Sequence, residues 1–270
     1  MLQIRELRTS DIPLLKDFAP PEWKVDLSQL FGRHFGRPDF HPIAAELDGR
    51  TVGCAEGLLH GNAGWLGNII VLPESRGRGI GRALTETLVA FFTAKIVQYQ
   101  ILIATPMGEP IYRKLGFETV SQYVFFEKQE APGSMDAVPG VRPLTAADYE
   151  DVFALDRLVT GEMRTPFLRG FLDAAWAHVD SSGNLDGYYL PQLGNGLVIA
   201  SNDAAGLALM QHKLNQGASS SCVPEQNPVA AEFLRSHGFV EAWRAPRMTL
   251  GPDLGWQPEH VYCRGSGYCG

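Results

Sequence analysis

The chain repeats one pattern in its two halves, and this repetition limits the folds open to its 270 residues. Residues 4–11 (IRELRTSD) are typical of a short strand followed by a Thr/Ser/Asp helix start, and residues 141–148 (VRPLTAAD) begin the second half in a similar way. Near the end of each half, a Gly-Phe pair at 116–117 and at 238–239 follows a predicted helix. Glycine often ends a helix because it adopts the left-handed backbone conformation without steric strain. Two matches in the same order predict a duplicated unit.

Residues 129–140 lie between the two copies. They contain two prolines and two glycines and have no helical or strand periodicity, which is typical of a linker. We therefore predict a first domain at 1–128, a linker at 129–140 and a second domain at 141–270.

The first copy predicts a series of strands followed by alternating helices and strands. Strands are expected at 42–47, 51–60 and 65–72, with Asp48-Gly49 as a hairpin turn. A buried helix follows, because apolar residues recur at helical spacing at Leu84, Leu88, Phe91, Phe92 and Ile96. This order predicts a mixed α/β (α+β) fold, with a mixed, largely antiparallel sheet flanked by helices in each domain.

The composition indicates a globular protein that lies in the cytoplasm. Hydrophobic residues make up 45% of the chain, which is too many for a disordered one. No apolar run approaches the roughly 18 residues that a membrane span needs, and the charged N-terminus is unlike a secretory signal. The four cysteines, Cys54, Cys222, Cys263 and Cys269, match neither a zinc motif nor a disulfide framework. We expect free thiols, no metal and no membrane partner.

The net charge of −7 is unevenly distributed. Residues 1–128 hold 14 basic and 14 acidic side chains, whereas residues 129–270 hold 9 and 16. An acidic second half argues against a nucleic-acid partner, because phosphates require a basic surface. It is compatible with a cationic substrate such as an amine, although solubility alone explains it equally well.

The segment 71–84 carries the strongest indication of chemistry. A predicted strand leads into a loop with Gly77, Gly79 and Gly81, and the loop opens a predicted helix. Glycines let successive backbone N–H groups turn toward one ligand, and the N-terminus of a helix adds a positive partial charge. Arginines at 76, 78 and 82 add full positive charges. The loop therefore predicts a site for a diphosphate or polyphosphate.

Two common phosphate motifs are absent from this loop. No Lys-Ser or Lys-Thr pair follows the glycines, so it is not a P-loop. The dinucleotide motif fails in both registers, because Arg82 or Leu84 stands where Gly or Ala is required. The segment does match R-x-x-G-x-G, at Arg76, Gly79 and Gly81.

This loop resembles the pyrophosphate signature of the GNAT N-acetyltransferase superfamily. A second signature follows at 110–117 (PIYRKLGF), where a helix ends in Leu-Gly-Phe with Tyr112 one turn before the glycine. The resemblance is close over 65–117, and the predicted strands and helices of 1–128 fit the same fold. It implies acetyl-CoA as the co-substrate.

The resemblance also implies roles for individual residues. Main-chain groups of Ile70, Val71 and Leu72 would pair with the pantetheine arm. Tyr112 would give a proton to the departing thiolate; a half-buried packing role is its alternative. Thr105 stands where many family members have an asparagine that contacts CoA. The pyrophosphate would be held by the backbone N–H groups of Arg76, Gly77, Arg78, Gly79, Ile80 and Gly81.

The general base is less evident. An attacking amine must lose a proton, and some family members use a glutamate on the strand before the glycine loop, but the strand at 65–72 has no acid. Glu56 and His60 lie on the preceding strand and would face the same side. Either could accept the proton directly or through water, and either could equally be an ordinary strand residue.

The second copy lacks these features. Its corresponding loop, 201–206, has no arginine and contains Asp203, which would repel a pyrophosphate, and Leu234 stands in the place of Tyr112. It resembles the degenerate C-terminal domain of tandem GNAT proteins. We expect it to bind no CoA and to form a wall of the acceptor site.

The sequence thus predicts an N-acetyltransferase that moves an acetyl group from acetyl-CoA to the amine of a small molecule or peptide. Direct transfer is expected, because no serine or cysteine lies in a recognisable nucleophile motif. The alternative is a non-catalytic CoA-binding sensor or assembly module.

Overall fold

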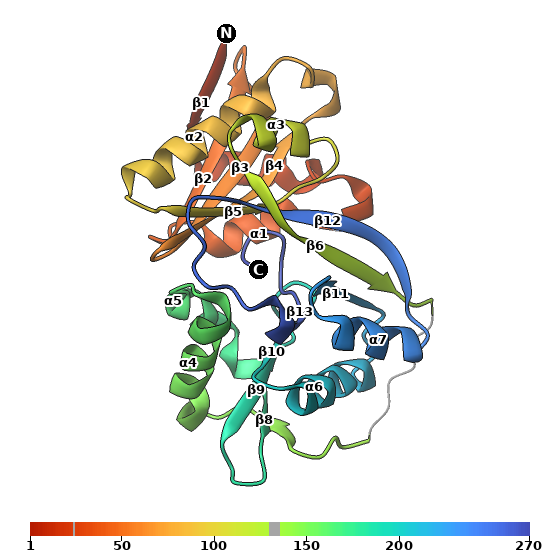
Figure 1. The fold of residues 1–270 in the computed structure, drawn as a ribbon. Helices are drawn as coiled ribbons and strands as arrows, with labels where there is room; N and C mark the ends of the chain where they lie inside the picture. Colours follow the sequence, from red (N-terminus) through yellow and green to blue (C-terminus); the bar gives the residue numbers. More distant parts are fainter. Residues whose placement is uncertain (24, 130–135) are drawn as a thin grey trace. The chain divides into compact units, whose positions relative to one another are not determined.

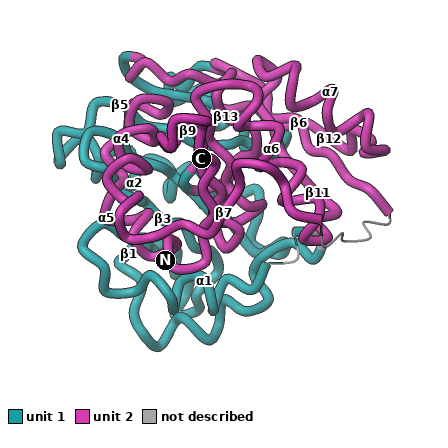
Figure 2. Tube along the Cα trace, turned by 90° about the horizontal axis from the view of Figure 1, so that it is seen from below, with its two compact units in different colours: residues 1–118, 248–252, 269 teal, residues 119–247, 253–268, 270 magenta. Residues whose placement is uncertain are grey.

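A computed structural model describes residues 1–23, 25–129 and 136–270 (Figure 1). Much of the predicted linker at 129–140 therefore lies outside the described residues. The chain forms two compact units, and each has the mixed α/β architecture that the sequence predicts (Figure 2). Unit 1 consists of residues 1–118, 248–252 and 269, and unit 2 of residues 119–247, 253–268 and 270.

Unit 1 is built on a run of antiparallel strands that ends with a parallel pair. Strands β1 to β4 pair in sequence order, and β5 runs parallel to β4. The predicted hairpin turn is confirmed, because Asp48 and Gly49 have φ of +49° and +81° between β2 and β3. The elements are β1 (Leu2–Glu6), α1 (Leu27–His34), β2 (Phe40–Leu47), β3 (Arg50–His60), β4 (Ala63–Val71), α2 (Ile80–Ala94), β5 (Tyr99–Ile103) and α3 (Glu109–Lys114).

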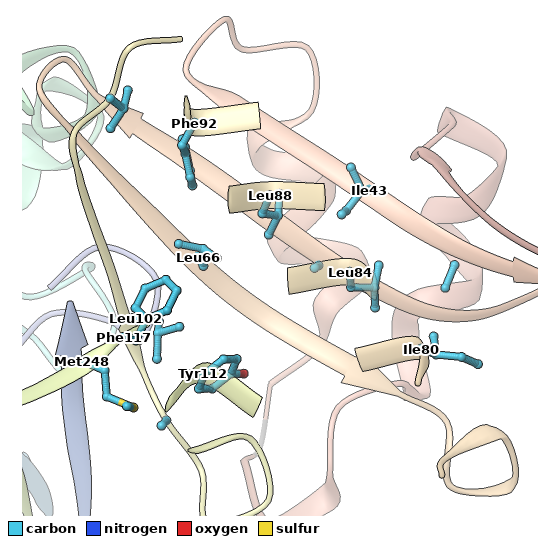
Figure 3. Packing of buried hydrophobic residues seen from close by; sticks show 14 of the residues in the cluster. Ile43, Leu66, Ile80, Leu84, Leu88, Phe92, Leu102, Tyr112, Phe117 and Met248 are labelled. Carbon is cyan, nitrogen blue, oxygen red and sulfur yellow. The ribbon is translucent and has the colours of Figure 1, made fainter. Parts of the chain in front are cut away.

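Helix α2 covers one face of this sheet with a continuous apolar stripe. Figure 3 shows its buried side chains above Ile43 of β2 and Leu66 of β4; they are Ile80, Leu84, Leu88 and Phe92. Glycines on the strands let the helix approach closely, since a Cβ on Gly64 would lie 2.7 Å from the ring of Phe92. One expectation was wrong. Ile96 lies beyond the end of α2 and is 83% exposed.

Unit 2 contains the remaining elements. A five-stranded sheet has the order β13-β10-β9-β8-β7, and β6 pairs with β11 in the other sheet. The elements are β6 (Glu118–Glu127), β7 (Val141–Pro143), α4 (Tyr149–Thr160), α5 (Thr165–Leu168), β8 (Trp176–Val179), β9 (Leu185–Leu190), β10 (Leu197–Ala200), α6 (Asp203–Asn215), β11 (Ser220–Pro224), α7 (Pro228–Ser236), β12 (Val240–Leu250) and β13 (Val261–Cys263).

Unit 1 includes a segment from the far end of the sequence. The end of β12 contributes Met248, which is 0% exposed and belongs to the core cluster that holds Leu102 and Phe117 (Figure 3). Gly251 follows with φ of +104°, and a Cβ there would lie 1.8 Å from the carbonyl oxygen of Gln98, so only glycine fits. The predicted domain boundaries at 128 and 141 stay a prediction. The compact units follow other limits, because nearly all of β6 belongs to unit 2 and the end of β12 belongs to unit 1.

Across the described residues, no helix combines the length and the apolar character needed to cross a membrane.

The buried position of Met248 gives a first prediction. Met248→Ala should lower the free energy of unfolding by about 2–5 kcal/mol, because it removes buried methylene and thioether atoms and leaves a cavity in unit 1. Urea denaturation followed by tryptophan fluorescence measures this. The matched variant Met107→Ala changes a side chain that is 66% exposed, and it should have an effect of no more than about 0.5 kcal/mol. Similar effects for both variants would contradict the assignment of β12 to the core of unit 1.

Candidate active site

Strands β4 and β5 separate part of the way along their length. Their parallel pairing covers Ala63–Trp65 and Tyr99–Ile101, but β4 continues to Val71. Backbone N–H and C=O groups need partners when they are removed from water. The separation therefore creates an edge within the sheet where a ligand can pair with the main chain of β4.

A β-bulge marks the point of separation. In the pairing of β3 with β4, Cys54 is opposite Ile70, but Glu56 is opposite Gly67, so β4 has one extra residue there. Asn68 lies in this bulge with a left-handed backbone, at φ of +45°. Asparagine tolerates this conformation better than most residues do. A bulge bends its strand and increases the local twist, which accounts for the departure of β4 from β5.

The sequence predicted that Ile70, Val71 and Leu72 present their main chain at this edge, and the structure distinguishes among them. The N–H of Leu72 donates to the carbonyl oxygen of Val52 on β3. Because backbone groups alternate in direction along a strand, Val71 directs its own groups away from β3. The carbonyl oxygen of Val71 accepts from Nε of Arg76 at 3.0 Å. Val71 is therefore the residue of the three whose N–H faces the open edge.

The glycine loop leads into an uncapped helix. Gly77 and Gly79 have φ of +74° and +77°, and Gly79 is the N-cap of α2 without any side-chain hydrogen bond. The first intrahelical bond runs from the N–H of Ala83 to the oxygen of Gly79. Among the described residues, no acceptor is found for the N–H groups from Gly77 to Arg82. The first turn of α2 also contains no acidic residue.

These features suit the start of α2 to attract an anion. Unpaired N–H groups at a helix N-terminus attract negative charge, and the helix dipole adds to the attraction. Arg76 and Arg78 are exposed beside it, and Arg82 pairs with Glu86 at 2.8 Å. Ile80 is 2% exposed and anchors the helix in the core, so its backbone is held in place.

Tyr112 projects from α3 into the core on the side of the sheet that α2 covers (Figure 3). Its side chain is 7% exposed, and its hydroxyl has no hydrogen bond to any described residue. Burial raises the pKa of Tyr112 to about 12. A Cβ on Gly108 would lie 2.8 Å from this hydroxyl, so the glycine makes room for the end of the ring. The hydroxyl of Thr105 makes a local hydrogen bond, because its Oγ1 accepts from the N–H of Gly108 at 3.2 Å.

Glu56 is fully buried on the opposite face of the sheet. The next residue, Gly57, faces α2, because a Cβ there would lie 2.9 Å from Phe92. Glu56 must therefore point away from α2. Its Oε1 accepts from Nδ2 of Asn68 at 2.7 Å, and its Oε2 has no hydrogen-bond partner. Burial raises the pKa of Glu56 to about 8, and the hydrogen bond from Asn68 opposes this shift.

The structure separates the two candidate bases. Glu56 lies opposite the bulge, whereas His60 lies at the far end of β3, beside the turn into β4. Four residues along a strand span roughly 13 Å. His60 is 1% exposed, on the same face as Glu56. Only Glu56 is adjacent to the place where β4 leaves β5.

Asn68 was not identified from the sequence. The signal is weak, because one asparagine in an apolar strand also fits a polar position on a solvated face. Its position two residues before Ile70, after Gly67, could have indicated a bulge. The strand at 65–72 thus carries no acid itself, but its amide holds an acid from the preceding strand, β3.

The second copy has no open edge beside β10. One side of β10 pairs with β9 over Leu197–Ala200, and the other side pairs with β13, where Val198 lies opposite Cys263. The strand near the C-terminus thus occupies the position that is open beside β4.

Helix α6 of the second copy is capped by the protein itself. Oδ1 of Asn202 accepts from the N–H of Ala205 at 3.0 Å, and the carboxylate of Asp203 lies in the first turn, where it accepts from the hydroxyl of Tyr262. The ring of Tyr262 packs on Gly206, where a Cβ would lie 2.3 Å away. Leu234 is 0% exposed in the core of unit 2. The carboxylate of Asp203 thus places a negative charge in the first turn of α6, where α2 has no acidic residue.

No group of three or more His, Cys, Asp or Glu side chains in the described part of the chain is arranged to hold a metal ion.

Two family models match the chain, and both are described as an acetyltransferase (GNAT) domain. One matches residues 38–119 and the other matches residues 152–263. The first match contains β4, the glycine loop and Tyr112, and the second contains β10 and α6. No curated protein matches the chain significantly.

Several solved structures share the whole architecture. A Pyrococcus horikoshii protein described as an acetyltransferase has a TM-score of 0.84 at 21% identity, with 100% of this chain and 96% of that chain covered. A GCN5-related N-acetyltransferase from Sphaerobacter thermophilus has a TM-score of 0.64 at 14% identity, covering 98% and 97%. A tandem GNAT protein from the clavulanic acid biosynthesis pathway has a TM-score of 0.61 at 16% identity, covering 94% and 99%. At these identities the likeness shows the fold.

The loop geometry gives a second prediction, which concerns stability. Gly79→Ala should lower the free energy of unfolding by about 1–2 kcal/mol, because alanine is strained in the left-handed conformation. Gly81→Ala is the matched control, since φ is ordinary there and a Cβ would lie 3.8 Å from Ile111 and Val71. It should be neutral or stabilise the protein by up to about 1 kcal/mol. Equal effects in urea denaturation would rule out this conformation of the loop.

Proposed function

Because the chain carries two GNAT acetyltransferase domains in tandem, we propose that it is an N-acetyltransferase that moves an acetyl group from acetyl-CoA to the amine of a small molecule or peptide. The observation that carries this proposal is the uncapped N-terminus of α2 beside the open edge of β4. The two features together suit an extended ligand with a diphosphate at one end.

Unit 1 would bind the two parts of CoA with different groups. The N–H groups from Gly77 to Gly81 would hold the pyrophosphate, and Arg76 and Arg78 would add charge attraction. The N–H of Val71 would pair with an amide of the pantetheine arm, as a strand partner does. The thioester would then lie near the bulge, where β4 leaves β5.

Glu56 and Tyr112 would handle the protons from opposite faces of the sheet. Glu56 accepts a proton from the attacking amine, which forms a C–N bond with the acetyl carbon. The tetrahedral intermediate then collapses, the C–S bond breaks, and Tyr112 gives its proton to the leaving thiolate. A carboxylate with a pKa of about 8 is a stronger base than an ordinary one once it has lost its proton. A phenol whose pKa is raised to about 12 remains protonated until the thiolate forms.

Asn68 would orient Glu56 for this work. Its amide holds Oε1 and leaves Oε2 as the oxygen that is free to take the proton. Because Asn68 lies in the bulge, the same distortion that opens the edge of β4 also positions the base. Asn68 is thus a positioning residue.

The second domain would bind no CoA. Its own β13 occupies the edge beside β10, and Asp203 and Asn202 cap α6. The proposal that this domain walls the acceptor site rests on the sequence resemblance.

A third prediction tests the activity itself. The purified protein should bind acetyl-CoA in a calorimetric titration and release free thiol when amines are supplied. Tyr112→Phe should lower kcat about 100-fold, because it removes the proton donor. Its affinity for acetyl-CoA and its thermal stability should not change, since the hydroxyl makes no hydrogen bond in the described chain.

Tyr149→Phe, on α4 of unit 2, is the matched control and should retain full activity. Tight binding of acetyl-CoA without turnover of any amine would favour the sensor alternative. Failure to bind CoA would contradict both the acetyltransferase and the sensor proposals.

A fourth prediction concerns the base. For the wild type, kcat/KM should rise with pH and level off above about 8, because Glu56 must lose its proton first. Glu56→Gln should lower the plateau by about 100-fold or more. Burial raises the pKa of Glu56 in the folded protein, so between its ordinary pKa and 8 the folded state binds more protons than the unfolded state. The stability that the neutral acid contributes is therefore lost as the pH rises through this range. Glu56→Gln should therefore exceed the wild type in unfolding free energy most clearly at alkaline pH.

Asn68→Gly removes the amide that holds Glu56 but keeps the bulge, because glycine adopts the left-handed backbone conformation easily. The variant therefore tests the side chain of Asn68 separately from the backbone geometry. The amide of Asn68 lowers the pKa of Glu56, so its loss should move the pH–rate profile to higher pH. An unchanged profile would contradict the proposed role of Asn68. A wild-type rate independent of pH between 6 and 9 would exclude Glu56 as the base.

A further inference from the structure

Unit 2 contains a lysine buried without a carboxylate. Lys213 on α6 is 2% exposed, and its Nζ donates to Sγ of Cys263 at 2.9 Å and to Oγ of Ser221 at 3.3 Å. No acidic residue in the described part of the chain forms an ion pair with it. A buried ammonium group is very unfavourable unless an anion compensates it. The thiol of Cys263 is the group in contact with Lys213 that can supply this anion.

Cys263 differs from the other buried cysteines in its surroundings. Its sulfur also accepts from Oγ of Ser221 at 3.3 Å. Burial alone would raise its pKa, but the charge and hydrogen bond of Lys213, together with hydrogen bonds from Ser221 and the backbone of Cys222, lower the pKa below the ordinary value. Cys222, equally buried on β11, has a pKa raised to about 12 by burial. A lowered pKa increases the fraction of thiolate at Cys263, and the thiolate is the reactive form of the side chain.

We propose that Lys213 and Cys263 form a site of reversible oxidative crosslinking, in which hydrogen peroxide is the oxidant. The geometry carries the proposal: a buried amine and a buried thiol are in direct contact, and they come from α6 and β13, which are distant in sequence. All of these residues belong to unit 2, and the proposal does not depend on the proposed acetyl transfer.

The reaction would proceed in two steps. First, the thiolate sulfur attacks one peroxide oxygen, the O–O bond breaks, and hydroxide leaves; the sulfur becomes a sulfenic acid and the peroxide is reduced. The hydroxide takes a proton from the ammonium of Lys213 and becomes water. Second, the free amine attacks the sulfur, an S–N bond forms, and the S–O bond breaks with loss of a second water. Sulfenic acids are known to condense with nearby nitrogen atoms in this way.

The position of Cys263 in the fold provides access for a small oxidant. Strand β13 has three residues and lies at the edge of its sheet, and the N–H of Arg264 directly after it donates to the carbonyl oxygen of Cys222. Short edge strands held by few hydrogen bonds open locally at lower free energy than central ones. Such an opening exposes Cys263 without unfolding α6, and reclosure returns the sulfur to Lys213.

Peptide mass spectrometry on the full chain tests this proposal. After treatment with hydrogen peroxide and digestion, a linked pair of peptides containing Lys213 and Cys263 is expected. Its mass should equal the sum of the two peptides less two hydrogens, and dithiothreitol should release it. Cys222 is the internal control and should remain an unmodified thiol.

Lys213→Met is the matched variant, because it keeps the length and packing of the side chain but removes the amine. It should give no linked peptide, and its Cys263 should oxidise at least 10-fold more slowly. If this variant does not fold, the proposal is still tested in the wild type, where Cys263 should be linked to Lys213 and Cys222 should remain an unmodified thiol. Oxidation of Cys263 without any link to Lys213, a disulfide with Cys222, or no reaction of Cys263 would each overturn the proposal.

Discussion

The separation of β4 from β5 is the constraint on which the candidate site depends. A regular parallel pair would satisfy the main chain of both strands and leave no edge for a ligand. The bulge at Asn68 prevents this, because one extra residue bends β4 away after Trp65. The uncapped start of α2 then lies directly beyond the end of that strand. One local irregularity therefore determines where β4 presents an open edge near the start of α2.

Much of the fold and part of the site could be predicted from the sequence, since both depend on local patterns. The glycines of the loop, the spacing of Tyr112 and the Asp48-Gly49 turn are features that short segments determine. The role of Asn68 could not be predicted, because a bulge depends on the register between two strands. Glu56 and His60 could not be separated for the same reason: alternation places both on one face, and only the register with β4 places Glu56 at the bulge. The identity of the buried partner of Lys213 depends on a contact across 50 residues.

The two copies differ at corresponding places in a common architecture. In the second copy, β10 is paired on both sides where β4 has an open edge, and a carboxylate lies in the first turn of α6 where α2 has no acid. Both changes satisfy backbone groups internally, which favours stability over ligand binding. The arrangement of Lys213 and Cys263 arises from this replacement, because β13 brings the thiol to α6.

The placement of residues 248–252 in unit 1 has a consequence for biosynthesis. The ribosome delivers residues 1–118 long before it delivers the end of β12, so the N-terminal unit must wait for a piece of its own core. During translation the face that receives Met248 is exposed to water and to other chains. The order of synthesis and the order of assembly therefore differ, and a nascent chain of this protein is at risk of aggregation until residues 248–252 emerge.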